Sequence, residues 1–164
     1  MLAGLPGQGA STSVVAVASD VDVHRVRYVV RQQAERLRFE SRHIVELQIV
    51  ASELATNIIK YGVRGKIAID AVHDPQREEG LRVVASDVGP HFHDLALALQ
   101  DDCNDRGPLD PDRPWPRSGL GAGLGAVVRL TDSFECNQYD GGKDIIVVKY
   151  RRPKRRRSRY SYSP

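Results

Sequence analysis

The chain has 164 residues, of which 41% are hydrophobic and 27% charged, a composition that suits a single globular domain with a buried core. No run of residues approaches the roughly 18 apolar positions that a membrane-spanning helix needs, so such a helix is excluded. The net charge of +3 is unevenly distributed: residues 151–164 hold seven basic residues and no acidic one, which leaves 17 basic against 21 acidic residues, a charge of −4, in residues 1–150.

The N-terminal part of the chain predicts a strand followed by two helices. Residues 1–12 have no basic or sustained apolar segment typical of a secretory signal, and we expect a flexible leader there. The short β-branched run at 13–18 predicts a strand. Apolar residues then recur at steps of three and four over two segments, with Asp20 and Ser41 as candidate caps, which predicts helices from Asp20 to about Phe39 and from Ser41 to Tyr61.

The middle of the chain predicts a hairpin, a short helix and a long loop. Residues 66–72 and 81–86 alternate between apolar and polar residues on either side of a polar turn, as in an antiparallel hairpin. A short helix is expected at 95–99. Four prolines and five aspartates at 101–117 predict an irregular loop, and a loop of this length in a small domain is usually functional.

The C-terminal part predicts a helix and a second hairpin. Four alternating glycines lead into a helix at 126–131, and strands at 133–139 and 144–150 are joined by a Gly141-Gly142 turn. This order of elements predicts an α+β domain at 13–150, a two-layer sandwich of a mostly antiparallel mixed sheet covered on one face by helices. The basic residues of 151–164 predict a disordered, solvated tail. Binding of nucleic acid is not expected, because no aromatic platform or groove-reading element accompanies them.

The two cysteines indicate the compartment. Cys103 and Cys136 lie far apart and outside any CxxC pattern. This spacing argues against a disulfide framework or a zinc site and favours a reducing, cytoplasmic setting.

A polar stripe on the second helix is the first candidate site. Glu46, Glu53, Asn57 and Lys60 share one face, well away from the apolar stripe. A carboxylate such as Glu53 can take a proton from a hydroxyl, and the amide oxygen of Asn57 can ligate Mg²⁺. The alternative is an ordinary solvated helix face.

Asp87-Val-Gly-Pro90, at the end of a predicted strand, is the second candidate. The Asp87 carboxylate can accept a hydrogen bond from an exocyclic amino group such as that of adenine, and Gly89 permits close approach to a flat ring. The alternative is a plain turn at the end of a strand.

The glycine cluster at 118–125 is the third candidate. Glycines followed by a helix N-terminus can cradle a triphosphate, because the first amides of the helix are free to bind anions. The cluster lacks the Lys-Ser/Thr pair of a Walker A loop and the preceding strand of a dinucleotide fold. The alternative is a flexible linker.

Taken together, these motifs resemble the GHKL, or Bergerat-fold, ATPases. The sequence is most similar to the anti-sigma-factor type serine/threonine kinases and, within them, to the RsbT-type stressosome switch kinases. The resemblance rests on an N box at 51–57, a G1 box at 87–90 and a G2 box at 119–124.

The resemblance implies roles for particular residues. Glu53 would be the general base, Asn57 the Mg²⁺ ligand and Asp87 the adenine-binding residue. Residues 101–117 would form the ATP lid. The nucleotide-binding set it implies is Asn57, Lys60, Asp87, Gly89, Gly119, Gly121, Ala122, Gly123 and Leu124.

The resemblance also implies partners and a reaction. The cofactors would be ATP and Mg²⁺, and the reaction phosphorylation of a serine or threonine on a STAS-domain antagonist or scaffold protein. A metal-dependent protein phosphatase or a sigma factor would be a further partner. The sequence departs from the family pattern at His91, where a glycine usually follows Gly-Pro, and at Lys143, where a threonine is often found.

Two other functions stay open at this point. The first is a switch module that binds ATP and acts by sequestering a partner, which His91 and Lys143 favour. The second is a nucleic-acid-associated protein whose functional part is the basic tail. A free-standing histidine kinase is less consistent with the sequence, because His24 and His43 lie on helices of the ATPase core and no separate helix carries a phospho-acceptor histidine.

Overall fold

The computed structural model describes residues 12–100, 103–104, 107–108 and 123–152. Its elements follow one another in the order β1 (Ser13–Val17), α1 (Asp20–Arg36), α2 (Ser41–Tyr61), β2 (Gly65–Asp74), β3 (Glu78–Asp87), α3 (Leu95–Ala98), β4 (Cys103–Asn104), β5 (Gly107–Pro108), α4 (Gly123–Leu130), β6 (Ser133–Tyr139) and β7 (Gly142–Tyr150). The predicted leader at 1–12, except for its last residue, and the tail from 153 onward lie outside the described residues, as do Gly119, Gly121 and Ala122.

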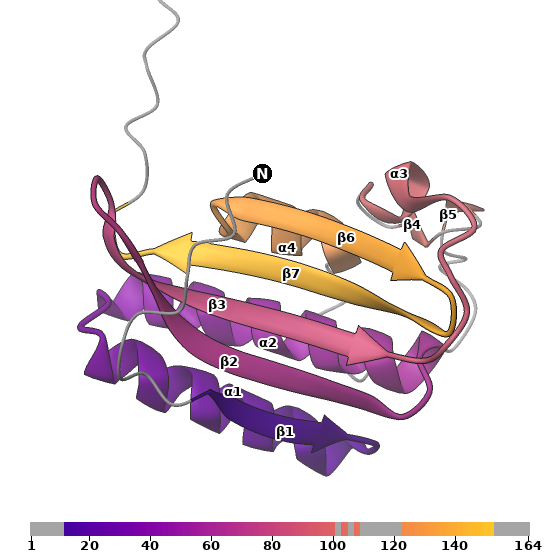
Figure 1. Ribbon diagram of the computed structural model, residues 1–164, viewed down its shortest axis with the longest axis horizontal. Helices are drawn as coiled ribbons and strands as arrows, with labels where there is room; N and C mark the ends of the chain where they lie inside the picture. The colour runs from indigo at the N-terminus through magenta and orange to yellow at the C-terminus, as the bar shows by residue number, and fades with distance from the viewer. Residues whose placement is uncertain (1–11, 101–102, 105–106, 109–122, 153–164) are drawn as a thin grey trace, which may run out of the picture.

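Five strands form one sheet in the order β1-β2-β3-β7-β6 (Figure 1). Each neighbouring pair is antiparallel, and the two predicted hairpins, β2 with β3 and β6 with β7, are both present. The last strand, β7, lies between β3 and β6, so the second hairpin joins the first through β7. As a result Asp87, at the end of β3, is the register partner of Lys143 on β7.

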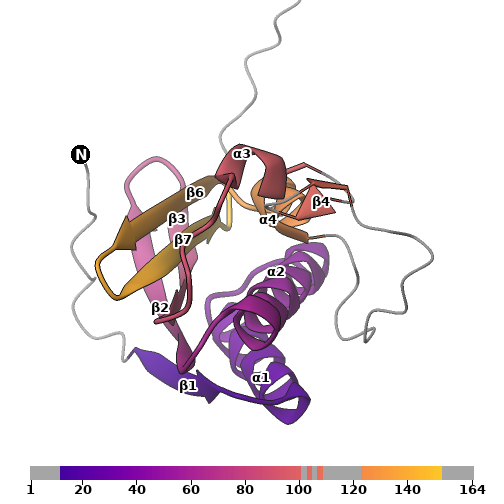
Figure 2. The ribbon, with the colours of Figure 1, turned by 90° about the vertical axis from the view of Figure 1, so that its right-hand side faces the viewer.

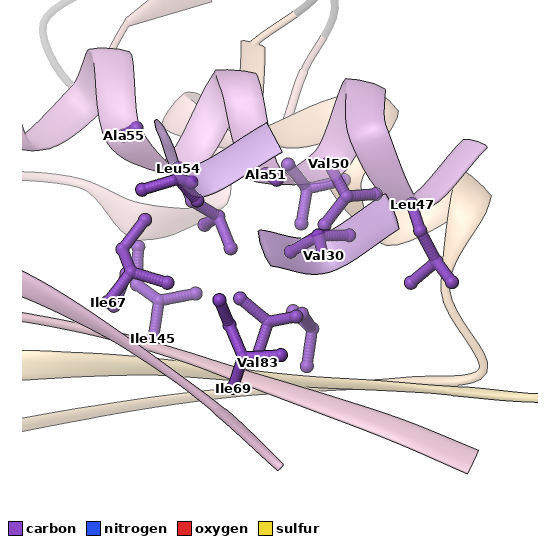
Figure 3. Packing of buried hydrophobic residues seen from close by; sticks show 14 of the residues in the cluster. Val30, Leu47, Val50, Ala51, Leu54, Ala55, Ile67, Ile69, Val83 and Ile145 are labelled. Atoms are coloured by element: carbon purple, nitrogen blue, oxygen red, sulfur yellow. The ribbon is translucent and has the colours of Figure 1, made fainter. Parts of the chain in front are cut away.

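Helices α1, α2 and α4 cover one face of this sheet (Figure 2). The predicted α+β sandwich is therefore confirmed. The core forms where α2 meets the sheet: Leu54 and Leu47 of α2 point toward Ile67, Ile69 and Val83, and all five side chains are fully buried (Figure 3). Burial of this apolar surface is the main force that holds the two layers together.

Two helix caps differ from the sequence prediction. Helix α1 is capped by Ser19 rather than Asp20, because Asp22 turns back to accept hydrogen bonds from the backbone amides of Ala18 and Ser19 at 3.1 and 3.0 Å. Helix α2 is preceded by Glu40 as its cap, with Ser41 as its first helical residue. Several neighbouring side chains can cap the start of a helix, and the apolar periodicity of the sequence does not show which of them does so.

The region predicted as an irregular loop contains two short paired strands, β4 and β5, while its remaining residues lie outside the described ones. Within the part of the chain that the structure describes, no helix combines the length and apolarity needed to cross a membrane.

Candidate functional site

Glu53 lies at the contact between α2 and α4. Its side chain is 4% exposed, and its Oε2 accepts a hydrogen bond of 3.1 Å from the backbone amide of Gly123. Asn57, one turn further along α2, is half-buried, and Lys60 is exposed. The polar stripe of α2 is therefore not a uniformly solvated helix face, because its carboxylate is buried against the start of another helix.

Gly123 begins α4 in a backbone conformation that favours glycine. Its φ is +63°, in the left-handed region where other residues are strained. Leu124 follows as a buried residue, 3% exposed. The amides of the first turn of a helix have no partners within that helix, so the start of α4 offers donors to an anion next to Glu53.

Asp87 is buried at the end of β3 with a cation beside it. Its Oδ1 accepts hydrogen bonds from Lys143 Nζ at 2.8 Å and from the amide of Gly89 at 2.7 Å. Both side chains of the ion pair are less than a tenth exposed. Both of these bonds fall on Oδ1, and among the described residues no hydrogen bond to Oδ2 is found, so that oxygen remains an acceptor for a ligand amino group.

Gly89 is required by the backbone around it. A Cβ at this position would lie 2.8 Å from the carbonyl oxygen of Tyr61 and 2.9 Å from the Cα of Gly62. Those two residues form the C-terminal end of α2. Because a side chain cannot fit there, the turn after β3 packs directly on this helix end, and Asp87 sits beside it.

The segment after Asp87 is tied to the hairpin of β6 and β7. His91 Nε2 lies 2.7 Å from the carbonyl oxygen of Tyr139, and the amide of Phe92 donates to Gln138 Oε1 at 2.6 Å. Lys143 adds a bond to the carbonyl of Pro90 at 2.8 Å and lies over the Phe92 ring. His91 and Lys143, the two departures from the family pattern, therefore both act in holding this segment in place.

Helix α2 connects the two halves of the candidate site. Glu53 meets the start of α4, while Gly62, nine residues later, lies against Asp87. At a rise of about 1.5 Å per residue these two positions are roughly 14 Å apart. Asn57 and Lys60 lie between them on the same stripe. The arrangement is extended, with the carboxylate acceptor of Asp87 at one end and the amides of the helix start at the other.

The residues present fit a magnesium nucleotide. Mg²⁺ usually keeps several waters and takes few protein ligands besides substrate phosphates, so a single amide such as Asn57 suits it. In the described part of the chain no group of three or more His, Cys, Asp or Glu side chains could hold a metal by itself. The hydroxyl of Thr56, next to Asn57, is buried without a hydrogen-bond partner among those residues.

A separate groove of about 700 Å³ lies between β1 and α1. Val14, Val21 and Tyr28 line it, and each is at least 60% exposed. It contains none of the predicted site residues, so we do not assign it to the candidate site.

The sequence pattern pointed to Lys143 but not to its partner Asp87, and it gave no signal for Gln138. Both contacts link segments that are about 50 residues apart, so they depend on the position of β7 beside β3. The sequence predicted a strand at 144–150 but carried no information about its second neighbour, β3.

Comparison with known proteins agrees with this geometry. The model of the histidine kinase-like ATPase domain matches residues 16–149, and the chain belongs to that family. The predicted family resemblance is thus confirmed.

Two kinds of curated relative are similar to the chain. The serine/threonine-protein kinase RsbT of Bacillus subtilis (strain 168) is 33% identical over 141 residues, which cover 85% of this chain and 97% of the relative. The serine-protein kinase RsbW of Bacillus cereus (strain G9842) is 26% identical over 128 residues, 76% of this chain and 75% of the relative.

A solved structure shares the fold. The crystal structure of the RsbU and RsbW domains of a Mycobacterium tuberculosis protein superposes with a TM-score of 0.55 over 87% of this chain, at 12% sequence identity. The chain spans about a third of that structure, 32% of its length.

Proposed function

We propose that this protein is an ATP-dependent serine/threonine protein kinase of a partner-switching pathway. The observation that carries the proposal is the hydrogen bond between Glu53 and the Gly123 amide, which joins the candidate base to the start of the candidate phosphate-binding helix. The names of the curated relatives support it, since the full length of the RsbT relative is nearly covered. The proposal places the protein in the cytoplasm, where ATP is available.

Each candidate residue has a part in the proposed reaction. Glu53 would accept the proton of the attacking serine or threonine hydroxyl. The free amides at the start of α4 would bind the phosphates and hold them in line, which is most of what phosphoryl transfer requires. Asp87 Oδ2 would accept a hydrogen bond from the adenine amino group, with Gly89 beside it. Mg²⁺, held by Asn57, would neutralise charge on the phosphate oxygens.

The partner we propose is a STAS-domain antagonist or scaffold protein that supplies the acceptor hydroxyl. A metal-dependent protein phosphatase or a sigma factor is the further partner that a switch of this kind would bind. Support for these partners comes from the resemblance of the N, G1 and G2 boxes to those of anti-sigma-factor type kinases.

Replacement of Glu53 by Gln tests the assignment. The glutamine keeps an oxygen that can accept from the Gly123 amide, but it cannot take a proton. We expect phosphotransfer from labelled ATP to a STAS-domain acceptor protein to fall by roughly 10²–10⁴-fold. Affinity for a fluorescent ATP analogue should stay within about a factor of three.

The control for this experiment is Glu35→Gln, which removes an exposed carboxylate of α1 paired with Arg31 and should change neither quantity. If Glu53→Gln transfers phosphate at the wild-type rate, Glu53 is not the base.

A second candidate function is a switch module that binds ATP and acts by sequestering its partner without turnover. The observation that favours it is the ion pair between Lys143 and Asp87, which already uses one oxygen of the base-binding carboxylate. Titration with the fluorescent analogue, with and without Mg²⁺, followed by a turnover assay separates the two. Tight binding without turnover supports the switch module, and turnover supports the kinase.

A further inference from the structure

Helix α4 is tied to α2 at both of its ends. At the N-terminal end, the Gly123 amide donates to Glu53. At the C-terminal end, Lys149 Nζ of β7 donates to the carbonyl oxygen of Leu130 at 2.8 Å and forms an ion pair with Glu46 Oε2 of α2, also at 2.8 Å. The ammonium of Lys149 therefore bridges the last residue of α4 to α2.

The spacing of these contacts is the same on both helices. Glu46 and Glu53 are seven residues apart on α2, and Gly123 and Leu130 are seven residues apart on α4. Seven residues are two helical turns, about 10.5 Å in each helix. The two helices therefore run antiparallel, and the two contacts fix both the position of α4 along α2 and its direction.

Lys149 is well placed to hold a helix end. It is 8% exposed, so its bonds are shielded from water. The last carbonyls of a helix lack partners within the helix and carry the negative end of its dipole. A buried ammonium donates a hydrogen bond to such a carbonyl and also offsets the negative partial charge.

Two hydrogen bonds donated by backbone amides strengthen the same end of the helix. The amide of Asp132 donates to the carbonyl of Val148 at 2.8 Å, and the amide of Tyr150 donates to Asp132 Oδ2 at 2.7 Å. The turn after α4 is thus bonded to β7 on both sides of Lys149. The C-terminal end of α4 is fixed to the sheet, while at its N-terminal end Gly123 is bonded to the residue proposed as the base.

We propose that Lys149 is a positioning residue for the nucleotide triphosphate: with Glu46 it fixes the C-terminal end of α4 on α2, so that the amides at the other end face the phosphates beside Glu53. This proposal rests on the proposed function. In this proposal Lys149 contacts neither the phosphates nor the adenine. It acts through the position of α4, so its replacement should weaken only the binding of the phosphates.

The test compares the affinities of ATP and adenosine, measured by calorimetry with Mg²⁺ present. In Lys149→Met we expect ATP affinity to fall about tenfold, because the amides of α4 lose their alignment. Adenosine affinity should stay within about twofold, because adenosine lacks the phosphates that α4 binds. Lys149→Arg, whose guanidinium can still donate to both Leu130 and Glu46, should restore most of the ATP affinity.

The matched control is Arg82→Met. It removes the cation paired with the buried carboxylate of Asp70, 2.6 Å away, its register partner across β2 and β3. It should lower stability without changing the ratio of the two affinities. If Lys149→Met does not fold, Glu46→Gln is used, and we expect a smaller change in the same direction.

The outcomes separate the two proposals. Wild-type protein that binds neither ATP nor adenosine contradicts the proposed function and this inference with it. Wild-type binding of both ligands, with ATP and adenosine affinities that fall equally in Lys149→Met or stay unchanged, overturns the positioning role alone.

Discussion

The carboxylate of Asp87 has two different oxygens. Oδ1 is held by Lys143 and by the amide of Gly89, so the plane of the carboxylate is fixed before a ligand arrives. A fixed acceptor loses little freedom when a base binds to its other oxygen. On this view Lys143 orients Asp87 rather than replacing the nucleotide.

Asp87→Asn tests this arrangement. The neutral amide is a weaker acceptor and leaves the Lys143 ammonium buried opposite a group without charge. We expect affinity for the fluorescent ATP analogue to fall by roughly 10- to 100-fold. The control is Asp70→Asn, which breaks another buried ion pair, that with Arg82. Equal affinities in the two variants would contradict the role of Asp87.

At the scale of residues, the sequence predicted local relations and missed most distant ones. The spacing of Glu53 and Asn57 placed both on one face of a helix, and that face is the one that meets α4 at Glu53. The contact of Glu53 with Gly123 spans 70 positions, and only the family resemblance, not periodicity, brought the two motifs together. The pairing of Asp87 with Lys143 depends on strand order, which no local pattern encodes.

At the scale of elements, the contacts at the C-terminal end of α4 include the carboxyl group of Glu46. We expect the stability that this group contributes to depend on pH. Burial by itself raises the pKa of Glu46, but the hydrogen bonds from Lys149 and Arg42 outweigh it and hold the pKa below its ordinary value of 4.5. A carboxyl group whose pKa is lowered in the folded state stabilises the folded protein at pH values above its ordinary pKa. That contribution is lost as the pH falls through the lowered value.

We therefore expect the stability difference between wild type and Glu46→Gln to depend on pH. The wild type should be more stable near neutral pH by about 1 kcal/mol, allowing for screening by solvent. The difference should shrink as the pH is lowered below 4.5, because the carboxylate becomes protonated. Urea denaturation at a series of pH values measures it. A difference that stays constant down to acid pH would contradict the ion pair with Lys149.

The elements themselves were largely predictable from the sequence. A period of three to four residues located the two long helices, a period of two located the first hairpin, and the Gly141-Gly142 turn located the second, with boundaries that moved by up to three residues. The start of α4 moved by three residues, to Gly123 from the expected 126, because a glycine that discourages a helix in isolation is held here by contact with Glu53. The short strands β4 and β5 have too few residues for any period to be detected.

At the scale of the whole molecule, one layer of helices and one sheet share a single core. Leu54 lies in the middle of this core, on the same helix as Glu53 and one residue after it. The core therefore fixes the helix that carries the candidate base, since one face of α2 packs on the sheet while another meets α4.

Leu54→Ala should destabilise the whole domain. Removal of a fully buried leucine side chain leaves a cavity and is expected to cost about 2–5 kcal/mol in the free energy of unfolding, measured with urea. The control is Val14→Ala on β1, whose side chain is 60% exposed and whose loss should change stability by less than about 0.5 kcal/mol. Similar losses in both variants would be inconsistent with a single core beneath α2.

The central claim is that a magnesium nucleotide lies along α2, from Asp87 to the start of α4. A crystal structure with Mg²⁺ and a non-hydrolysable ATP analogue tests it most directly. We predict the adenine amino group on Asp87 Oδ2, the metal on the amide oxygen of Asn57, and the triphosphate at the first amides of α4 beside Glu53. A nucleotide bound in the groove between β1 and α1, with Asn57 unligated, would contradict the account.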